Sequence, residues 1–250
     1  MSATYRNHHF GKIVRMEKNH FWFRSRDRML RRILLRFVPH PGNIRFLEVG
    51  CGTGIVLRML RSVGFTATGL DVNQKAIELS RRHTDAELVR SSFHTFQTAT
   101  TYPCIGAFDV LEHQRDDIGF LKKSFTLLVP GGHLFLTVPA GKRLWSRLDE
   151  LEGHKRRYDP SDLIAKLERV GFRITFWNYW QVVTLPIYYV WRLWVDRGKK
   201  SSVGHYLKEL PNITNAILFF LLLAEEPFFW RMRYPAGATL VVVAQKPDYS

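Results

Sequence analysis

One stretch, residues 46–73, limits most strongly what this chain can fold into. An apolar run, residues 44–49, ends at the loop Gly50-Cys51-Gly52-Thr53-Gly54, and residues 55–60 follow with the apolar spacing of a helix. A second apolar run, residues 65–70, ends at Asp71. Glycines at alternate positions allow a sharp turn and a close approach of a ligand, and a helix start offers free N–H groups. The pattern predicts half of a nucleotide-binding sheet, with Asp71 placed to accept the hydroxyl hydrogens of a ribose.

Composition limits the number of domains and the kinds of partner. The chain has 250 residues, of which 46% are apolar, and this favours one large α/β domain with an elaboration. Its 37 Lys and Arg against 22 Asp and Glu give a net charge of +15, which favours phosphate, nucleic acid or acidic lipid as a partner without choosing among them. Two cysteines, Cys51 and Cys104, do not form a disulfide framework, and residues 1–10 lack the apolar core of a signal peptide. We therefore expect a reducing, cytoplasmic compartment.

The glycine loop resembles that of class I S-adenosylmethionine-dependent methyltransferases, which carry an acid, here Glu48, two residues before G-x-G-x-G. A dinucleotide dehydrogenase would more often have its third glycine one position later. The resemblance implies an α/β fold with a Rossmann-like seven-stranded sheet, mostly parallel with an antiparallel last strand, and helices on both faces. It implies S-adenosyl-L-methionine as the cofactor and S-adenosyl-L-homocysteine as the product. The cofactor-binding residues that it implies are Glu48, Gly50, Cys51, Gly52, Thr53, Gly54, Asp71, Val72, Asn73, Ser92, Phe93, Phe108, Asp109 and His113.

Later segments extend the resemblance. A helix is predicted at residues 74–82 and a strand at 87–89, after which Ser92 stands where the family commonly has an acid that holds the adenine amino group. A serine hydroxyl can accept the same hydrogen bond more weakly. A strand pattern at residues 104–111 runs into Asp109-Val110-Leu111-Glu112-His113, similar to the family's motif at the fourth strand. The resemblance places Phe108 and Asp109 beside the methionine part of the cofactor. A helix at 120–128, a turn at 129–132 and a fifth strand at 133–139 follow.

A divalent metal is a lesser alternative at this motif. In the ubiquinone-pathway O-methyltransferases, an acid-x-x-Glu-His pattern binds such a metal, and Asp109, Glu112 and His113 fall on it. No further ligand is visible in the sequence, so we favour a helix-capping and pocket-wall role and predict no metal.

The segment after the fifth strand, residues 140–158, carries the predicted catalytic residues. It leaves the carboxyl end of that strand, where doubly wound sheets bind their ligands. Its G-H-x-R-R-Y is similar to a pattern in bacterial methyltransferases that act on small or lipid-linked substrates. We predict His154 as general base and Arg156 and Arg157 as clamps for a phosphate or carboxylate, with Asp149 and Tyr158 beside them. Alternatively, residues 156–158 only order the loop and cap the helix that begins near residue 160.

The chain divides into four predicted parts. Residues 1–40 form an N-terminal helical lid, in which His20 to Arg24 either cover the cofactor or anchor the helix on the core. Residues 41–179 form the cofactor-binding core, 180–235 an aromatic helical cap inserted before the last strand, and 236–250 that strand and the tail. The cap has apolar helical stretches at 182–195 and 213–224, both shorter than a bilayer span of about 20 residues. Basic residues flank them: Arg192, Arg197, Lys199, Lys200, Lys208, Arg231 and Arg233. The cap is a membrane interface, an internal cover or a dimer interface.

The sequence as a whole predicts a methyltransferase that acts on an oxygen of a small, lipidic or lipid-linked anionic substrate. Peripheral attachment to the inner face of a membrane stays open, and the oligomeric state is not predicted. One alternative is a nucleic-acid methyltransferase, although no Asn-Pro-Pro-Tyr type motif or appended RNA-binding module is visible. The other is an inactive cofactor-binding adaptor at a membrane, because Ser92 and Tyr102-Pro103 depart from the family pattern.

Overall fold

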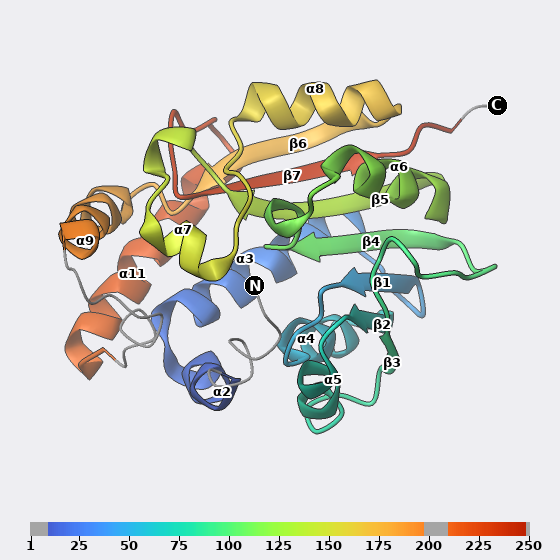
Figure 1. Cartoon of the computed structure of the whole chain (residues 1–250), viewed down its shortest axis with the longest axis horizontal. Helices are drawn as coiled ribbons and strands as arrows, with labels where there is room; N and C mark the ends of the chain where they lie inside the picture. The colour runs from blue at the N-terminus through green and yellow to red at the C-terminus, as the bar shows by residue number, and fades with distance from the viewer. Residues whose placement is uncertain (1–9, 198–209, 249–250) are drawn as a thin grey trace.

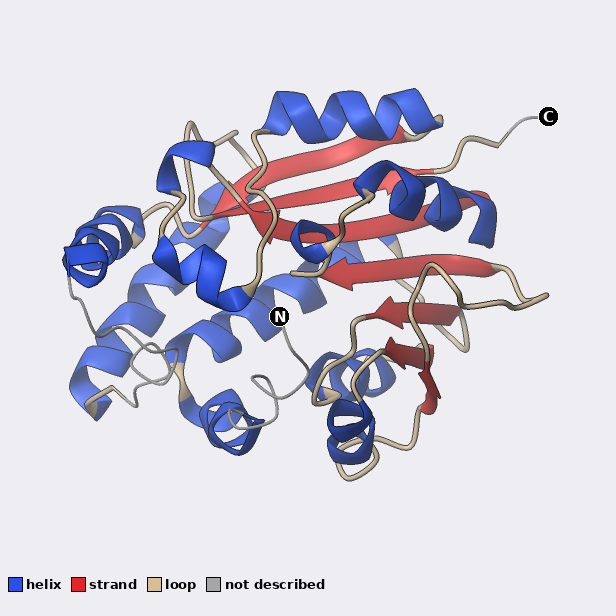
Figure 2. Ribbon diagram, viewed as in Figure 1, coloured by secondary structure: helices blue, strands red, loops and turns tan. Residues whose placement is uncertain are grey.

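A seven-stranded sheet runs through the centre of the computed structural model, which describes residues 10–197 and 210–248 (Figures 1 and 2). The strand order is β3-β2-β1-β4-β5-β7-β6. The strands are β1 (Arg45–Val49), β2 (Thr66–Asp71), β3 (Glu87–Arg90), β4 (Tyr102–Phe108), β5 (Leu128–Pro139), β6 (Arg173–Trp180) and β7 (Thr239–Gln245). The first nine residues of the predicted lid, and Lys199, Lys200 and Lys208 of the predicted cap, lie outside the described residues.

Strand direction confirms the predicted fold. Strands β3, β2, β1, β4 and β5 pair in parallel, whereas β7 pairs antiparallel with both β5 and β6. The strand order reverses between β1 and β4, so the carboxyl ends of these two strands mark the point where ligands bind in open α/β sheets. The protein therefore has the doubly wound core that the glycine loop predicts.

Helices cover both faces of the sheet (Figure 2). One core cluster unites one face of the sheet with α6 and α8 through side chains such as Phe120 and Leu163, and the other joins the opposite face to α3, α4 and α11 through Leu30, Leu57 and Leu222. Burial of these apolar stripes holds the layers together. The longer helices are α2 (Phe10–Asn19), α3 (Phe21–Phe37), α4 (Ile55–Ser62), α5 (Gln74–Ser80), α6 (Asp117–Leu127), α7 (Arg147–Glu152), α8 (Pro160–Val170), α9 (Leu185–Arg197) and α11 (Asn212–Phe229).

Strand β5 is longer than predicted, because the predicted turn at 129–132 lies inside it. Leu128 pairs with Tyr102, and the pairing then shifts so that His133 faces Cys104. The extra residues include Gly131, whose φ of 74° lies in the left-handed region that glycine adopts at low cost. The turn chemistry thus produces a bulge, and the sheet continues on both sides of it.

Helix α11 also differs from its prediction. It continues past residue 224 to Phe229, through Pro227, and so includes Glu225 and Glu226. By length and composition it could cross a membrane, with 17% of its 18-residue window buried in the protein. The prediction that both helices of the insertion are too short for a span is therefore wrong for α11. Few residues of α11 are buried, because the helix packs against the protein along one side only.

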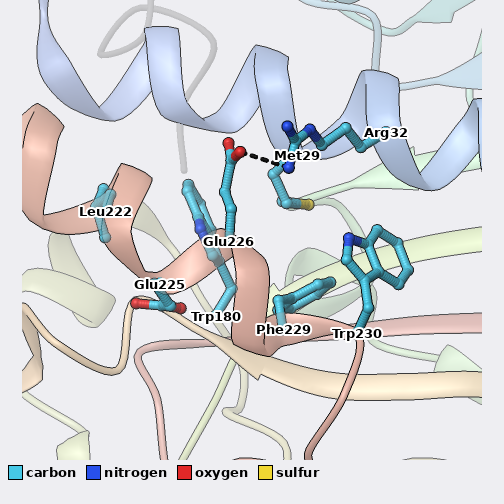
Figure 3. Close-up of a pocket in the computed structure, with 8 residues that line it drawn as sticks. All are labelled: Met29, Arg32, Trp180, Leu222, Glu225, Glu226, Phe229 and Trp230. Atoms are coloured by element: carbon cyan, nitrogen blue, oxygen red, sulfur yellow. Dashed lines mark ion pairs between the residues drawn. The ribbon is translucent and has the colours of Figure 1, made fainter.

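The insertion is attached to the N-terminal helices. Asn215 of α11 accepts a hydrogen bond from Phe21 N (2.7 Å) and donates one to Asn19 O (2.8 Å), so it bridges the junction of α2 and α3. Glu226 forms ion pairs with Arg28 and Arg32 of α3, both at 2.6 Å. Figure 3 shows this second contact, with Glu226 reaching Arg32 across a small pocket between α3 and α11. The two predicted coverings, lid and cap, therefore form one connected unit.

Candidate active site

The glycine loop lies between β1 and α4 and leaves room for a ligand at its middle residue. Gly52 and Gly54 have φ values of 54° and 82°, a backbone region that residues with a Cβ rarely adopt. A Cβ at Gly54 would lie 2.2 Å from Ser80 Oγ, so close packing of α4 on α5 requires glycine there. A Cβ at Gly52 would meet no atom within 4 Å. Protein atoms therefore pack closely against the loop at Gly54, whereas the space beside Gly52 is free of protein atoms.

Two carboxylates stand at adjacent strand ends beside this loop. Asp71 accepts hydrogen bonds from Gly52 N (3.0 Å) and Asn73 N (2.8 Å), which couples the end of β2 to the loop. Glu48 pairs in register with Gly69 of β2 and is 3% exposed. Its Oε2 has no hydrogen-bond partner in the described part of the chain. Burial raises the pKa of Glu48 to about 8, Asp71 raises it as well, and Arg26 opposes the change.

These residues fit S-adenosylmethionine. An unpaired buried carboxylate suits a cationic ligand, because the ligand supplies the missing partner. Each oxygen of Asp71 keeps a free lone pair for a ribose hydroxyl. The backbone of Gly52 is accessible to a ligand, because no protein atom fills the space beside it. The two strand ends are neighbours, as the sequence predicts for a site that embraces an adenosyl amino acid.

Helix α3 reaches the same site through Arg26. Its guanidinium donates to Asp109 Oδ2 (2.9 Å) and to Phe108 O (3.3 Å) at the end of β4. Asp109 has a φ of 61° and also accepts from Thr137 Oγ1 (3.2 Å). Sequence reasoning missed Arg26. The sequence does contain a signal for Arg26. It stands three residues before Met29 and four before Leu30, both buried, so it lies on the apolar side of this amphipathic helix.

Helix α2 reaches the loop through Glu17, which sequence reasoning also missed. The Thr53 hydroxyl donates a hydrogen bond to Glu17 Oε1, and the two residues are 5% and 8% exposed. By contrast, two of the predicted lid residues contact the insertion: Phe21 N donates to Asn215, and the Arg24 guanidinium lies 4.0 Å from the centre of the Phe219 ring. The contacts with the cofactor loop therefore come from residues on either side of that cluster.

The remaining predicted cofactor residues line the neighbouring strand ends. Ser92 uses its hydroxyl to accept from His94 N (3.2 Å), and Phe93 is buried in the core. Asn73 caps α5, whereas Val72 is 57% exposed at the rim beside Asp71. Burial raises the pKa of the Cys51 thiol above its ordinary value. Of these side chains, Val72 is therefore the one most available for apolar contact with a base.

A second group of polar side chains surrounds Asp149, in helix α7. The Asp149 side chain is fully buried and accepts from His154 Nδ1 (2.8 Å), Arg157 Nε (2.9 Å), Arg192 NH2 (2.6 Å) and Ser146 N (2.9 Å). Burial acts to raise the pKa of Asp149, but the hydrogen bond to His154 and the charges of both arginines outweigh it, so this pKa lies below its ordinary value. Asp149 is therefore ionised at neutral pH.

The ring of His154 is oriented by this carboxylate. Because the ionised Asp149 can only accept a hydrogen bond, Nδ1 of His154 carries a proton. Nε2 lies 3.3 Å from Glu152 Oε2 and 3.9 Å from Glu112 Oε1. The His154 side chain is 10% exposed. The general-base role predicted for His154 would use Nε2, the nitrogen that these two carboxylates also face.

Glu112 and His113 lie with His154, whereas Asp109 does not. One potential ligand atom from each of Glu112, His113 and His154 lies within 4.8 Å of the others. Burial raises the pKa of Glu112 well above its ordinary value, and the charge of Asp109 adds to this effect. Asp109 is held by Arg26 and Thr137. The metal ligand set suggested by the acid-x-x-Glu-His pattern is therefore not the set that the fold brings together.

The predicted anion clamps have protein partners. Arg157 is 3% exposed and donates to Asp149, to Ala140 O (2.9 Å) and to Tyr188 OH (3.3 Å). Arg156 pairs with Asp117 at 2.6 Å, as part of a cluster that also binds the hydroxyl of the buried Tyr158. The geometry corresponds to the alternative reading, in which these residues order the loop before α8. We correct the clamp prediction on this ground.

Arg192 joins the insertion to this group. It lies on α9, is 4% exposed, and donates to Leu144 O (2.7 Å) as well as to Asp149. Sequence reasoning placed it on a membrane-facing flank. Its signal was a charged residue within the apolar run of this helix, since a charge is stable in a protein interior only when it is paired.

The fold and the site define a class I S-adenosylmethionine-dependent methyltransferase. The family model for the methyltransferase domain matches residues 22–175, and the chain belongs to this family. S-adenosylmethionine is its cofactor. Membership of a family of methyltransferase enzymes identifies the chain as an enzyme of this class.

Among curated proteins, the chain is similar to a ubiquinone biosynthesis O-methyltransferase of Vibrio parahaemolyticus, with 32% identity over 100 residues. The match covers 37% of this chain and 43% of that enzyme, so it spans less than half of the relative. Among solved structures, a methyltransferase from Archaeoglobus fulgidus has a TM-score of 0.58 and 18% identity, covering 94% of this chain and 99% of that chain. The N-methyltransferase NodS from Bradyrhizobium japonicum, in complex with S-adenosylhomocysteine, has a TM-score of 0.56 and 18% identity, covering 93% and 91%. These structures share the fold.

Proposed function

We propose that this enzyme methylates an oxygen atom of a small, lipidic or lipid-linked acceptor that carries negative charge. The observation that carries the proposal is the pair of His154 and Asp149, 2.8 Å apart and largely buried near the carboxyl ends of β4 and β5. A hydroxyl must lose its proton as its oxygen attacks a methyl group, and a positioned histidine is the side chain most often used for this. The naming of the Vibrio relative as an O-methyltransferase supports oxygen as the acceptor atom.

The chemistry divides between the cofactor and the chain. S-adenosylmethionine, when bound, supplies a methyl group that its sulfonium already activates. The glycine loop, Glu48 and Asp71 would hold it, and Arg26 would fix the wall at Asp109. His154 Nε2 takes the acceptor proton, and the ionised Asp149 stabilises the imidazolium that results. Burial of this pair excludes water, which strengthens both interactions.

Exposed apolar side chains on the insertion support a lipidic acceptor that is taken from a membrane. They gather on two helices, α9 and α11, and are Ile187, Tyr189, Val190, Ile213, Ile217, Phe220 and Phe228. Pro186, Ile187, Val190 and Trp191 line an open groove on α9. Arg231 and Arg233 are exposed just beyond α11, so apolar and cationic groups lie together, as in helices that bind anionic lipid surfaces. The occupant that we propose for this face is an anionic phospholipid bilayer.

Labelling identifies the acceptor class. The enzyme would be incubated with methyl-labelled cofactor and, separately, with a total lipid extract, a water-soluble metabolite pool and nucleic acid from the same cells. We expect label in the lipid extract, in a product whose methyl group is bound to oxygen. Label confined to nucleic acid would replace this proposal by the alternative acceptor.

The His154→Gln variant tests the assigned base. Loss of general-base catalysis lowers turnover by about 10²- to 10⁴-fold. His40→Gln, at an exposed position after α3, is the matched control and should keep full activity. An unchanged rate in His154→Gln would remove His154 from the mechanism.

Flotation tests the membrane surface. We expect the protein to float with vesicles that contain anionic phospholipid and to stay at the bottom with purely zwitterionic ones. Anionic headgroups attract the cationic Arg231 and Arg233, and zwitterionic headgroups do not. A double variant, Ile217→Asp with Phe220→Asp, should abolish flotation, since both side chains are more than half exposed on α11. Flotation that survives this variant would show that another surface is used.

A further inference from the structure

Glu17 has no role in the cofactor site described so far, although it contacts the glycine loop. It lies in the last turn of α2, and its carboxylate accepts a hydrogen bond from the hydroxyl of Thr53, between Gly52 and Gly54. Both side chains are largely buried. The backbone oxygen of Thr53 contacts the ring of His83 (2.9 Å), so the loop is held from two sides at this residue.

The acidic side chains around the loop differ in whether a neighbouring group balances their charge. Asp109 is paired with Arg26 at 2.9 Å, so these two charges offset each other. Glu48, with a pKa of about 8, is mostly protonated at neutral pH when no ligand is bound. The hydrogen-bond partner of Glu17 is a neutral hydroxyl. Burial raises the pKa of Glu17, whereas the hydrogen bond from Thr53 and the charges of His83, Arg58 and Arg26 act against this rise. When ionised, Glu17 brings a negative charge to the loop that its own hydrogen bond does not neutralise.

A second observation points to a cationic ligand at the same loop. Glu48 Oε2 is buried and has no hydrogen-bond partner among the described residues, and Glu48 stands two residues before the first glycine. A buried carboxylate oxygen without a donor lacks the hydrogen bond that native structures normally provide. Glu48, on β1, thus offers an acceptor beside the loop that a cationic ligand could supply with a donor.

The cofactor and its product differ by one unit of charge. S-adenosylmethionine carries a sulfonium, an ammonium and a carboxylate, hence a net charge of +1. S-adenosylhomocysteine has lost the sulfonium charge and is neutral overall. A fixed negative charge in a partly desolvated site therefore favours the donor over the product.

We propose that Glu17 is a cofactor-selecting residue, whose carboxylate on α2 makes the site prefer the cationic methyl donor and release the neutral product. Its position depends on the lid, because α2 joins α3 at the junction that Asn215 bridges. The proposal rests on the cofactor of the family and is independent of the acceptor, so the two can fail separately.

Calorimetric titration of the Glu17→Gln variant tests the proposal without turnover. The ligands are S-adenosylmethionine, S-adenosylhomocysteine and sinefungin, an analogue with an amine, and so a cation, near the position of the sulfonium. We expect the affinity of the variant to fall about tenfold for the two cationic ligands and to change less than about twofold for the neutral product. An equal loss for all three, or no loss for any, would overturn the proposal.

Two controls separate charge from structure. Glu78→Gln removes the same charge from the exposed face of α5 and should leave all three affinities unchanged. Thr53→Val removes the hydrogen bond but keeps the charge of Glu17, and should keep the preference for cations. If Glu17→Gln does not fold, Glu17→Asp retains the charge and must retain the preference. Loss of the preference in Glu17→Asp or Thr53→Val would contradict a role of the charge.

Discussion

The cofactor end and the acceptor end of this site are built in different ways. The cofactor end depends on a contiguous loop, residues 50–54, whose backbone geometry is encoded by glycines and whose neighbours are the ends of adjacent strands. The proposed acceptor end depends on Asp149 of α7, which binds His154 and Arg157 from the segment between α7 and α8 and Arg192 from α9. The first is local and made largely of backbone, whereas the second is a buried ion network between distant segments. Damage to the first should weaken cofactor binding, and damage to the second should lower both turnover and stability.

The largest effect is expected from Asp149→Asn. Removal of one charge from a buried, hydrogen-bonded ion network leaves Arg157 and Arg192 unpaired, which costs about 3–5 kcal/mol of folding free energy. Chemical unfolding measures this loss. Glu150→Gln, the exposed neighbour, is the control and should unfold like the wild type. Equal stability of the two variants would show that the network does not hold α7 and α9 together.

The next effect concerns pH at the cofactor end. The pKa of Glu48 is about 8 in the folded protein against an ordinary value of 4.5, so the ligand-free folded state holds an extra proton between these two pH values. Its stability should therefore fall as pH rises through this window, with a limiting slope of about 1.4 kcal/mol per pH unit from this group. Urea unfolding at pH 5 to 8 checks the slope. The slope should flatten in Glu48→Gln, and an identical slope in that variant would exclude Glu48 as its source.

Gly52→Ala should weaken cofactor binding at the open point of the loop. The added Cβ meets no protein atom within 4 Å, so the fold tolerates it apart from a backbone cost of about 1–2 kcal/mol at positive φ. The methyl group occupies the space left for the ligand, and we expect a loss of affinity of about tenfold or more. Gly64→Ala, also at positive φ but with 3.7 Å to its nearest neighbour, is the matched control for backbone cost. The same affinity in both variants would show that the ligand lies elsewhere.

The smallest effect is expected at the link between the two ends. Asn215→Ala removes two hydrogen bonds between α11 and the junction of α2 and α3, each worth about 1 kcal/mol. Because this junction positions Glu17 and Arg26, we expect a two- to threefold loss of cofactor affinity, on the order of 0.5 kcal/mol. Titration calorimetry would compare it with Asn212→Ala, at the exposed start of the same helix. A loss of affinity in Asn212→Ala but not in Asn215→Ala would show that the hydrogen bonds of Asn215 do not support cofactor binding.

The sequence predicts the cofactor end well because its signals are local. Glycine spacing, Glu48, Asp71 and the strand patterns lie within 30 residues of one another, and period and turn chemistry determine their arrangement. The seven-stranded sheet with its antiparallel last strand, which the resemblance to the methyltransferase family implies, is confirmed. Residue pairs such as Arg26 with Asp109 or Asn215 with Phe21 are 83 and 194 positions apart, and no local pattern encodes them.

The acceptor end shows the opposite limit. The sequence predicts that residues 140–158 carry the catalytic residues, with a histidine and a neighbouring acid among them. A clamp for a substrate would need an exposed side chain, but Arg157 faces the interior. The sequence does not predict this, because a loop lacks the regular repeat that shows which side chains of a helix or strand are buried. Burial of Arg157 follows from Asp149 and from Arg192 on α9, which only the tertiary structure brings together.

The single-turnover rate at saturating cofactor, measured for Gly52→Ala and His154→Gln with the acceptor found by labelling, tests the separation of the two ends most directly. We expect Gly52→Ala to recover at least about half of the wild-type rate once the cofactor is saturating, because its defect is in binding. His154→Gln should stay slower by about 10²-fold or more, because its defect is in proton transfer. A His154→Gln variant that recovers the full rate while Gly52→Ala stays slow would contradict the account.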